Sequence, residues 1–188
     1  MGHLAALPIH DLVPKFKLNT FVETGTYLGS GIAFARGFTD LEEFHSIDIN
    51  HHFYQDAKTM FSFDPDVHLH LGHSPEILQQ ILEYMAERRI LFWLDAHLPE
   101  IYGQEPSSEE VRLPLEQELE TILSMRPRND DFIVIDDLRI YEEGPYEYGN
   151  LPKRPTPDAS FINDMVGDRY DISKAVWQTG FLILSPKS

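Results

Sequence analysis

Cysteine is absent from this chain of 188 residues. The protein therefore has no disulfide bond, no thiolate nucleophile and no cysteine-ligated zinc site. A chain without cysteine suits a reducing compartment, and we expect a cytoplasmic location. We also expect no signal peptide, because the first residues lack a basic start followed by a long apolar run. No stretch has the apolar length of a membrane span.

Positive charge is scarce. The chain has 15 Lys and Arg residues against 31 Asp and Glu, which gives a formal net charge of −16. This balance argues against binding nucleic acid or an anionic membrane by bulk electrostatics, so we expect neither partner. A small-molecule partner is compatible with the charge, and so is assembly into a homo-oligomer. Hydrophobic residues make up 42% of the chain, which is enough for the core of a single domain.

Strand-like and helix-like segments alternate along the chain. The pattern predicts strands at residues 20–23, 43–48, 67–71, 90–95 and 132–137. It predicts helices at about 30–36, near 53–60, and after residues 74, 114 and 156. Two last strands, at 170–177 and 180–184, should form an antiparallel hairpin. The order predicts one doubly wound α/β domain, residues 1–188, with a mostly parallel seven-stranded sheet and helices on both faces.

Two long polar loops, residues 98–113 and 138–155, interrupt this alternation. Loops of such length in a compact domain are usually functional lids or disordered segments, and we interpret both as lid-like. The second loop carries Tyr141, Tyr146 and Tyr148. These tyrosines could line a sugar or aromatic pocket, or they could simply pack the loop.

Acidic residues end two apolar strands. Asp95 closes the segment Ile-Leu-Phe-Trp-Leu, and Asp136 and Asp137 close Phe-Ile-Val-Ile. An unpaired carboxylate is costly in a core, but it suits the open edge of a parallel sheet, where α/β proteins bind ligands. Oxygen ligands that converge there suit a hard cation such as Mg²⁺. The alternative is that these carboxylates cap local structure without a metal.

A glycine-rich turn follows the first strand. Gly25, Gly29 and Gly31 separate that strand from the first predicted helix. The dinucleotide fingerprint would need glycine where Tyr27 and Ser30 stand, so the pattern does not favour NAD. Glycine there lets the chain turn sharply and lets a ligand approach, but a tight structural turn alone explains it equally well.

The ends of the second and third strands carry further polar residues. Asp48 could accept hydrogen bonds from both ribose hydroxyls of a nucleoside cofactor. Its alternative role is a helix N-cap, which Asn50 could equally fill. Ser74 lies near the expected adenine position, and it is also a suitable N-cap for the next helix.

With these motifs, residues 20–184 resemble a class I S-adenosylmethionine-dependent methyltransferase. The glycine turn resembles the first motif of that superfamily, Asp48 its ribose-binding acid and Ser74 its adenine-side turn. The resemblance implies S-adenosyl-L-methionine as cofactor. By this resemblance, the residues that would bind the cofactor are Glu23, Gly25, Thr26, Gly29, Asp48, Ser74 and Asp95.

A closer resemblance is to the metal-dependent O-methyltransferases of the catechol and macrocin-type sugar families. In those, one Asp after the fourth strand and an acidic pair after the fifth bind Mg²⁺. By resemblance, Asp95, Asp136 and Asp137 would bind Mg²⁺ or another divalent cation here. His97, two residues after Asp95, could be the catalytic base, since the usual pKa of histidine suits proton transfer. It could instead support a carboxylate or bind the metal.

We therefore expect a Mg²⁺-assisted O-methyltransferase that acts on a hydroxyl of a small molecule, a sugar being one candidate. A metal-independent methyltransferase of the same fold is the main alternative. A non-catalytic nucleotide-binding or interaction module is another. Elsewhere, His68 and His70 share one face of a predicted strand and could bind metal, although exposed edge-strand histidines are the simpler interpretation.

Overall fold

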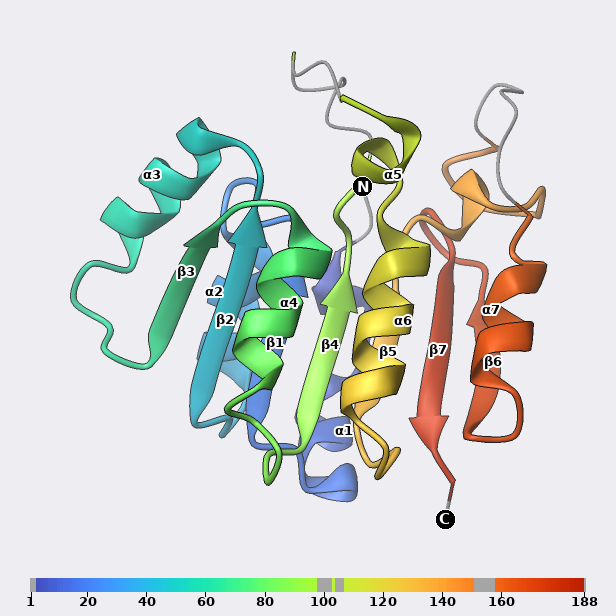
Figure 1. Ribbon diagram of the computed structural model, residues 1–188, viewed down its shortest axis with the longest axis horizontal. Coiled ribbons are helices and arrows are strands. Elements are labelled where there is room, and N and C mark those ends of the chain that lie inside the picture. The colour runs from blue at the N-terminus through green and yellow to red at the C-terminus, as the bar shows by residue number, and fades with distance from the viewer. Residues whose placement is uncertain (1–2, 98–102, 104–106, 151–157, 188) are drawn as a thin grey trace.

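The computed structural model describes residues 3–97, 103, 107–150 and 158–187. Within them the chain forms one seven-stranded sheet with strand order β3-β2-β1-β4-β5-β7-β6 (Figure 1). The strands are β1 (Thr20–Thr24), β2 (Glu43–Asp48), β3 (Val67–Leu71), β4 (Ile90–Leu94), β5 (Phe132–Ile135), β6 (Tyr170–Ala175) and β7 (Phe181–Pro186). The first five are parallel, and β7 pairs antiparallel with both β5 and β6. The predicted doubly wound sheet with a terminal antiparallel hairpin is confirmed.

Helices cover both faces of the sheet. They are α1 (Ile9–Phe16), α2 (Ser30–Phe38), α3 (His51–Met60), α4 (Ser74–Leu82), α5 (Glu109–Arg112), α6 (Leu115–Met125) and α7 (Ser160–Val166), with short 3-10 turns η1 (Leu4–Ala6) and η3 (Leu138–Ile140). Figure 1 shows α4, α6 and α7 in front of the sheet and α1 and α2 behind it. No helix in the described ranges combines the length and apolarity needed to cross a membrane.

The central strands are buried on both faces, which explains their continuous apolar runs. Successive side chains of a strand point to opposite faces, so β4 contributes to two separate clusters. Phe92 and Leu94 pack with α4 and α6, while Leu91 and Trp93 pack with α1 and α2. The sheet is thereby held rigidly between two helical layers, and its strand ends form a fixed platform.

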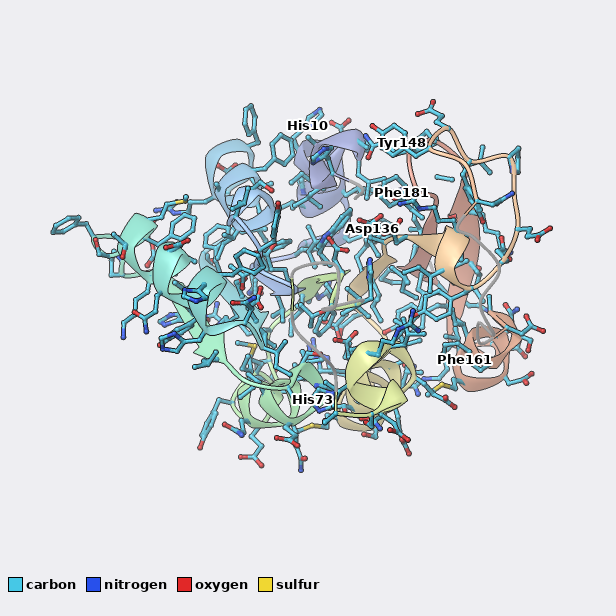
Figure 2. The ribbon with its side chains drawn as sticks, turned by 90° about the horizontal axis from the view of Figure 1, so that it is seen from above. His10, His73, Asp136, Tyr148, Phe161 and Phe181 are labelled. Atoms are coloured by element: carbon cyan, nitrogen blue, oxygen red, sulfur yellow. The ribbon has the colours of Figure 1, made fainter. Side chains whose placement is uncertain are left out.

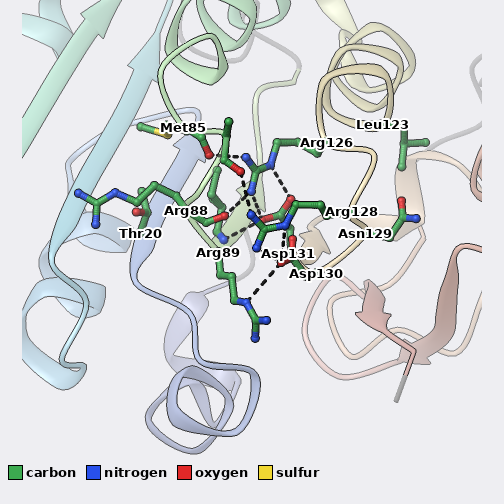
Figure 3. Close-up of polar contacts among 12 residues, drawn as sticks. Thr20, Met85, Arg88, Arg89, Leu123, Arg126, Arg128, Asn129, Asp130 and Asp131 are labelled. Atoms are coloured by element: carbon green, nitrogen blue, oxygen red, sulfur yellow. Dashed lines mark hydrogen bonds and ion pairs between the residues drawn. The ribbon is translucent and has the colours of Figure 1, made fainter.

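At the amino-terminal ends of the parallel strands, a buried arginine joins two loops (Figure 3). The guanidinium of Arg126 donates to both carboxylate oxygens of Asp131, from Nε at 2.8 Å and from Nη2 at 2.9 Å. It also donates to the backbone carbonyls of Met85 and Arg88. Asp131 in turn accepts a hydrogen bond from the backbone N–H of Ile90. These contacts fix the turn before β4 against the turn before β5.

Some local predictions differ from the structure. His73, not Ser74, is the N-cap of α4, and no side chain caps that helix. Asn50 caps α3 by accepting from the N–H of His52, so Asp48 is free of that role. The predicted start of the last helix at 156 lies outside the described residues, and α7 begins at Ser160.

The two predicted lid loops are described only in part. Residues 98–102, 104–106 and 151–155 lie outside the described ranges, so the lid-like interpretation of 98–113 and 138–155 stays a prediction. The first loop contains the short helix α5, and the second starts with η3. Tyr141 and Tyr146 are buried in the core, whereas Tyr148 is exposed. Two of the three tyrosines therefore pack the loop instead of lining an open pocket.

Candidate functional site

A cavity of about 330 Å³ opens at the carboxyl edge of the parallel strands. The connections after β1 and β4 diverge there, because β2 and β3 lie on one side of β1 and β5 lies beyond β4. This is the topological switch point at which open α/β sheets bind ligands. The cavity is lined by Gly25, Tyr27, Ile47, Asp48, Ile49, Asn50, Phe53, Gly72, His73, Ser74, Asp95, Ala96, His97, Val111, Pro114, Asp137 and Arg139.

Most of the predicted site residues meet at this cavity. Those in its wall are Gly25, Asp48, Ser74, Asp95, His97 and Asp137. Four others, Glu23, Thr26, Gly29 and Asp136, are not part of the wall.

Asp48 lies at the end of β2 with its carboxylate fixed by the backbone. The Tyr27 N–H donates to Oδ2 at 2.8 Å and the Asn50 N–H donates to Oδ1 at 2.7 Å. Burial raises the pKa of Asp48, and these backbone donors oppose the rise. Each oxygen keeps a second lone pair. The carboxylate can therefore accept two hydroxyls of a ligand in a set orientation.

Gly25 is required by packing within the protein. Its φ is +87°, and a Cβ there would lie 2.6 Å from the carbonyl oxygen of Asp95. A side chain at this position would therefore push the loop after β1 away from the loop after β4. Gly29, with φ of +72°, is the N-cap of α2, and a Cβ there would lie 3.2 Å from the ring of Phe61. Gly29 is a turn residue that does not reach the cavity.

Glu23 and Thr26 form a buried polar chain beneath the glycine turn. The Ser46 hydroxyl donates to Glu23 Oε1 at 2.7 Å and lies 2.6 Å from the Thr26 hydroxyl. A Cβ on Gly31 would lie 2.2 Å from Glu23 Oε2, so a side chain at position 31 would displace this carboxyl group. Burial raises the pKa of Glu23 to about 8. Glu23 is therefore mostly protonated at neutral pH and supports the turn from below.

Ser74 contacts a carboxyl group that the sequence analysis did not single out. Glu118 of α6 is buried, and its side chain is hydrogen-bonded to Ser74 and Thr24. Burial raises the pKa of Glu118 to about 7. A signal was present in the sequence, because position 118 falls on the apolar face of α6 between Leu115 and Leu119.

His97 lies between two of the predicted metal ligands. Its Nε2 is 2.9 Å from Asp137 Oδ2, and its Nδ1 is 3.5 Å from Asp95 Oδ1. Burial alone would lower the pKa of His97, but the hydrogen bond to Asp137 and the charge of Asp95 raise it to about 9. In this arrangement the imidazole carries a proton at neutral pH. It is therefore a cation and cannot serve as a proton-accepting base.

Asp137 has a second cationic partner. Arg139 Nε donates to Asp137 Oδ1 at 2.9 Å, which leaves each carboxylate oxygen of Asp137 facing a positive group. Burial opposes ionisation, but His97 and Arg139 lower the pKa of Asp137 to about 2. Arg139 lines the cavity and was not anticipated from the sequence, since an arginine just after a strand is common on a surface.

Asp136 is buried beside the cavity. Figure 2, a view from above the strand ends, places it near the middle of the molecule. Its Oδ1 accepts from the Asp137 N–H at 2.7 Å and from the Thr179 hydroxyl at 2.9 Å. Its Oδ2 is buried and has no hydrogen-bond partner among the described residues. Burial raises the pKa of Asp136, and the neighbouring Asp137 raises it further.

Asp95, Asp136 and Asp137 offer the carboxylate oxygens that suit a hard cation, but these oxygens do not converge on one point. Burial raises the pKa of Asp95 well above its usual range, the nearby Asp136 adds to this, and the charge of His97 opposes the rise only in part. Together with the unpartnered Asp136 oxygen, this favours a cation. Among the described residues, however, the oxygens of Asp95, Asp136 and Asp137 do not all lie within 4.8 Å of one another. Binding of one ion by all three residues would require their side chains to move closer together.

Comparisons with known proteins identify the fold. No family model matches the sequence. No curated protein matches it. Among solved structures, one described as a caffeoyl-CoA O-methyltransferase from Staphylococcus aureus has a TM-score of 0.65 at 14% identity. The alignment covers 100% of this chain and 85% of that one.

Two further structures contain the cofactor or its product. TomG from Streptomyces achromogenes, an O-methyltransferase of tomaymycin synthesis in complex with S-adenosylmethionine, has a TM-score of 0.60 at 18% identity, covering 96% of this chain and 78% of its own. An O-methyltransferase from Bacillus cereus in complex with S-adenosylhomocysteine has a TM-score of 0.59 at 16% identity, covering 97% and 86%. The fold is therefore the Rossmann-like class I methyltransferase fold.

Proposed function

We propose that this protein is an S-adenosylmethionine-dependent O-methyltransferase that acts on a hydroxyl of a small molecule with the help of a divalent cation such as Mg²⁺. The observation that carries the proposal is the cavity at the switch point. One side of it presents the fixed carboxylate of Asp48, and the other side presents Asp95 and Asp137. A cofactor and an acceptor could thus lie next to each other across its floor.

Asp48 is the residue proposed to orient the cofactor. Two backbone N–H groups hold its carboxylate, and the residue lines the cavity, so the carboxylate is presented there in a set orientation. The ribose of the cofactor offers two adjacent hydroxyls that match this arrangement. Ser74 lines the cavity on the side of α4, where the adenine would lie. The cofactor supplies an electrophilic methyl group on a sulfonium.

Asp95, Asp136 and Asp137 are proposed to hold the cation. A bound cation lowers the pKa of an acceptor hydroxyl and orients it. Asp136 contributes an oxygen that lacks a partner, and Thr179 and the Asp137 N–H keep that carboxylate in place. Asp95 lines the cavity at the end of β4. These residues position the acceptor, and positioning supplies a large part of catalysis in group transfer.

His97 is proposed to change role when a cation enters. Its raised pKa depends on the negative charges of Asp95 and Asp137. A divalent cation neutralises those charges, so the pKa of His97 should fall toward its usual range. The imidazole could then release its proton and serve as the base for the acceptor hydroxyl.

Calorimetric titration with S-adenosylhomocysteine tests the cofactor site. The wild type should bind one equivalent, and Asp48→Asn should weaken binding by about 1–3 kcal/mol, the range for losing a hydrogen-bonded charge. Asp40→Asn, which alters an exposed aspartate, is the matched control and should bind as the wild type does. Equal affinity in the wild type and the Asp48 variant, with both folded, would refute the assignment of Asp48.

Methyl transfer assays with and without Mg²⁺ test the metal. Turnover by the wild type should need Mg²⁺. Asp136→Asn should lose most of the turnover, and the activity that remains should not respond to Mg²⁺. A metal-independent methyltransferase is the second candidate, because His97 and Arg139 already neutralise Asp137 without any metal. Full turnover in the presence of a chelator would favour that candidate. Absence of cofactor binding would exclude both and leave a non-catalytic module.

A further inference from the structure

A second group of metal-ligating side chains lies on β2 and β3, away from the cavity. Glu43, His45 and His68 offer ligand atoms that all lie within 4.8 Å of one another. Glu43 and His45 are two residues apart on β2 and therefore point to the same face of the sheet. The parallel register pairs His45 with His68, which brings the third side chain to that face. None of the three lines the cavity.

The contacts within the group converge on one oxygen. Glu43 Oε1 lies 3.0 Å from His45 Nε2 and 3.8 Å from His68 Nε2. The rings of His45 and His68 are stacked, with their centroids 4.8 Å apart. Ligand atoms of a tetrahedral zinc site lie roughly 3–3.5 Å apart, as follows from metal–ligand distances of about 2.0–2.1 Å. A small movement of His68 would complete such a set.

Neighbouring residues orient two of these ligands. Arg88 Nη2 lies 3.1 Å from Glu43 Oε2, which leaves Oε1 for the histidines. His70 Nε2 lies 3.0 Å from His45 Nδ1. If His45 Nδ1–H donates to His70, the lone pair of His45 Nε2 faces the carboxylate of Glu43. A metal ion between the two would relieve that repulsion, and an outer hydrogen bond of this kind is usual for histidines that bind metals. Without a metal, the other tautomer lets His45 Nε2–H donate to Glu43 Oε1.

The group is open to an ion from one side. His45 is buried, whereas the side chain of His68 is 45% exposed on the edge strand β3. No helix lies in front of β3 in Figure 1.

We propose that Glu43, His45 and His68 form a binding site for Zn²⁺ or a similar late first-row transition ion. Two imidazoles and one carboxylate are a ligand set of zinc, whereas Mg²⁺ prefers oxygen ligands alone. The fourth position faces solvent and takes water. The ion joins the edge strand β3 to β2 and stabilises that side of the sheet. This site is independent of the proposed methyltransferase activity, since His45 lies three residues, roughly 10 Å, from Asp48 along β2.

Titration of the untagged protein with Zn²⁺ tests the proposal. The wild type should bind one Zn²⁺, and His68→Ala and Glu43→Gln should each weaken binding at least tenfold. His52→Ala removes an exposed histidine of α3 and should bind as the wild type does. Asp136→Asn should also leave Zn²⁺ binding unchanged, which separates this site from the acidic group at the cavity. Retained affinity in both His68→Ala and Glu43→Gln would overturn the proposal, as would loss of binding in Asp136→Asn.

Cobalt spectroscopy gives a second readout that does not depend on activity or stability. Co²⁺ in a four-coordinate site of nitrogen and oxygen ligands absorbs visible light far more strongly than hydrated Co²⁺. The wild type should develop this band, Zn²⁺ should remove it by displacement, and His68→Ala should not show it. A wild-type spectrum identical to that of hydrated Co²⁺ would contradict the site.

Discussion

Two buried glutamates, Glu23 and Glu118, have carboxyl groups whose pKa values burial raises to about 8 and about 7. In the unfolded chain both would ionise near the usual value for glutamate, about 4.3. Between these values the folded protein binds more protons than the unfolded chain does. The free energy of unfolding therefore falls as the pH rises through this interval.

We predict that Glu23→Gln makes stability less dependent on pH. The amide cannot ionise, so the decline between about pH 5 and pH 8 should become smaller by a few kcal/mol, since one pKa unit corresponds to about 1.4 kcal/mol. Denaturant unfolding at a series of pH values measures this. Glu120→Gln, at an exposed position of α6, should keep the wild-type slope. An unchanged slope in Glu23→Gln would mean that the carboxyl group is not neutral in the folded protein.

At the scale of elements, substitution of Arg126 tests how strongly its buried ion pair with Asp131 holds the turns before β4 and β5 together. Arg126→Met removes the cation but leaves Asp131 buried. We predict a loss of about 3–5 kcal/mol in the free energy of unfolding, the range for breaking a buried ion pair. Adding Asp131→Asn should recover part of the loss, because the amide is neutral and its oxygen can still accept from Ile90. Denaturant unfolding of both variants gives the comparison.

Arg128 provides the matched control for this experiment. It lies on the same loop, with its side chain 42% exposed, and pairs with Asp130 at 2.6 Å (Figure 3). Exposed ion pairs contribute little, so Arg128→Met should cost at most about 1 kcal/mol. Equal losses in Arg126→Met and Arg128→Met would contradict the role assigned to burial.

The strands and most helices of the sheet were predictable from the sequence, because apolar runs and helical spacing determine them directly. The N-terminal helix α1 was not predicted. Its apolar residues keep helical spacing, but the segment has only eight residues and contains Pro14, which is unfavourable inside a helix. The α4 cap was misplaced by one residue because Ser74 has the side chain of an N-cap, yet its hydroxyl is hydrogen-bonded to Glu118.

The site was predictable to the extent that strand ends determine it. Asp48, Asp95 and Asp137 reach the cavity because the carboxyl ends of parallel strands share one edge. The sequence analysis allowed that His97 supports a carboxylate, but it did not reveal that the partner is Asp137, 40 residues away, since such pairing depends on side-chain rotamers. Nor did it reveal that Gly25 is required by the Asp95 carbonyl. Substitution of Gly25 would therefore disturb the fold as well as any ligand.

For the whole molecule, the net charge of −16 makes ionic strength relevant to stability. A compact chain with excess negative charge repels itself, and salt screens that repulsion. We predict that the melting temperature rises as NaCl increases from roughly 0.02 to 0.3 M. Choline chloride should have the same effect at equal ionic strength. A melting temperature that falls in both salts would mean that screening of surface ion pairs outweighs the relief of repulsion.

Mg²⁺ should stabilise the protein beyond this screening. At matched ionic strength, a site-bound cation adds RT ln(1 + [L]/Kd) to the free energy of unfolding. Asp95→Asn should lose that addition and retain the response to NaCl. Melting temperatures in MgCl₂ and NaCl of equal ionic strength measure the difference. An identical response in the two salts would favour the metal-independent methyltransferase.

The contact between Thr179 and Asp136 links the acidic residues at the cavity to the C-terminal part of the chain. Thr179 precedes β7, and the carbonyls of Thr179 and Gly180 also accept from the backbone N–H groups of Arg139 and Leu138. During synthesis on a ribosome, residues up to β4 can emerge and pair before these contacts exist. The half of the cavity around Asp48 can thus assemble early, whereas the acidic half gains its final geometry only after the terminal hairpin has emerged. A nascent or truncated chain would accordingly resemble a cofactor binder before it could resemble an enzyme.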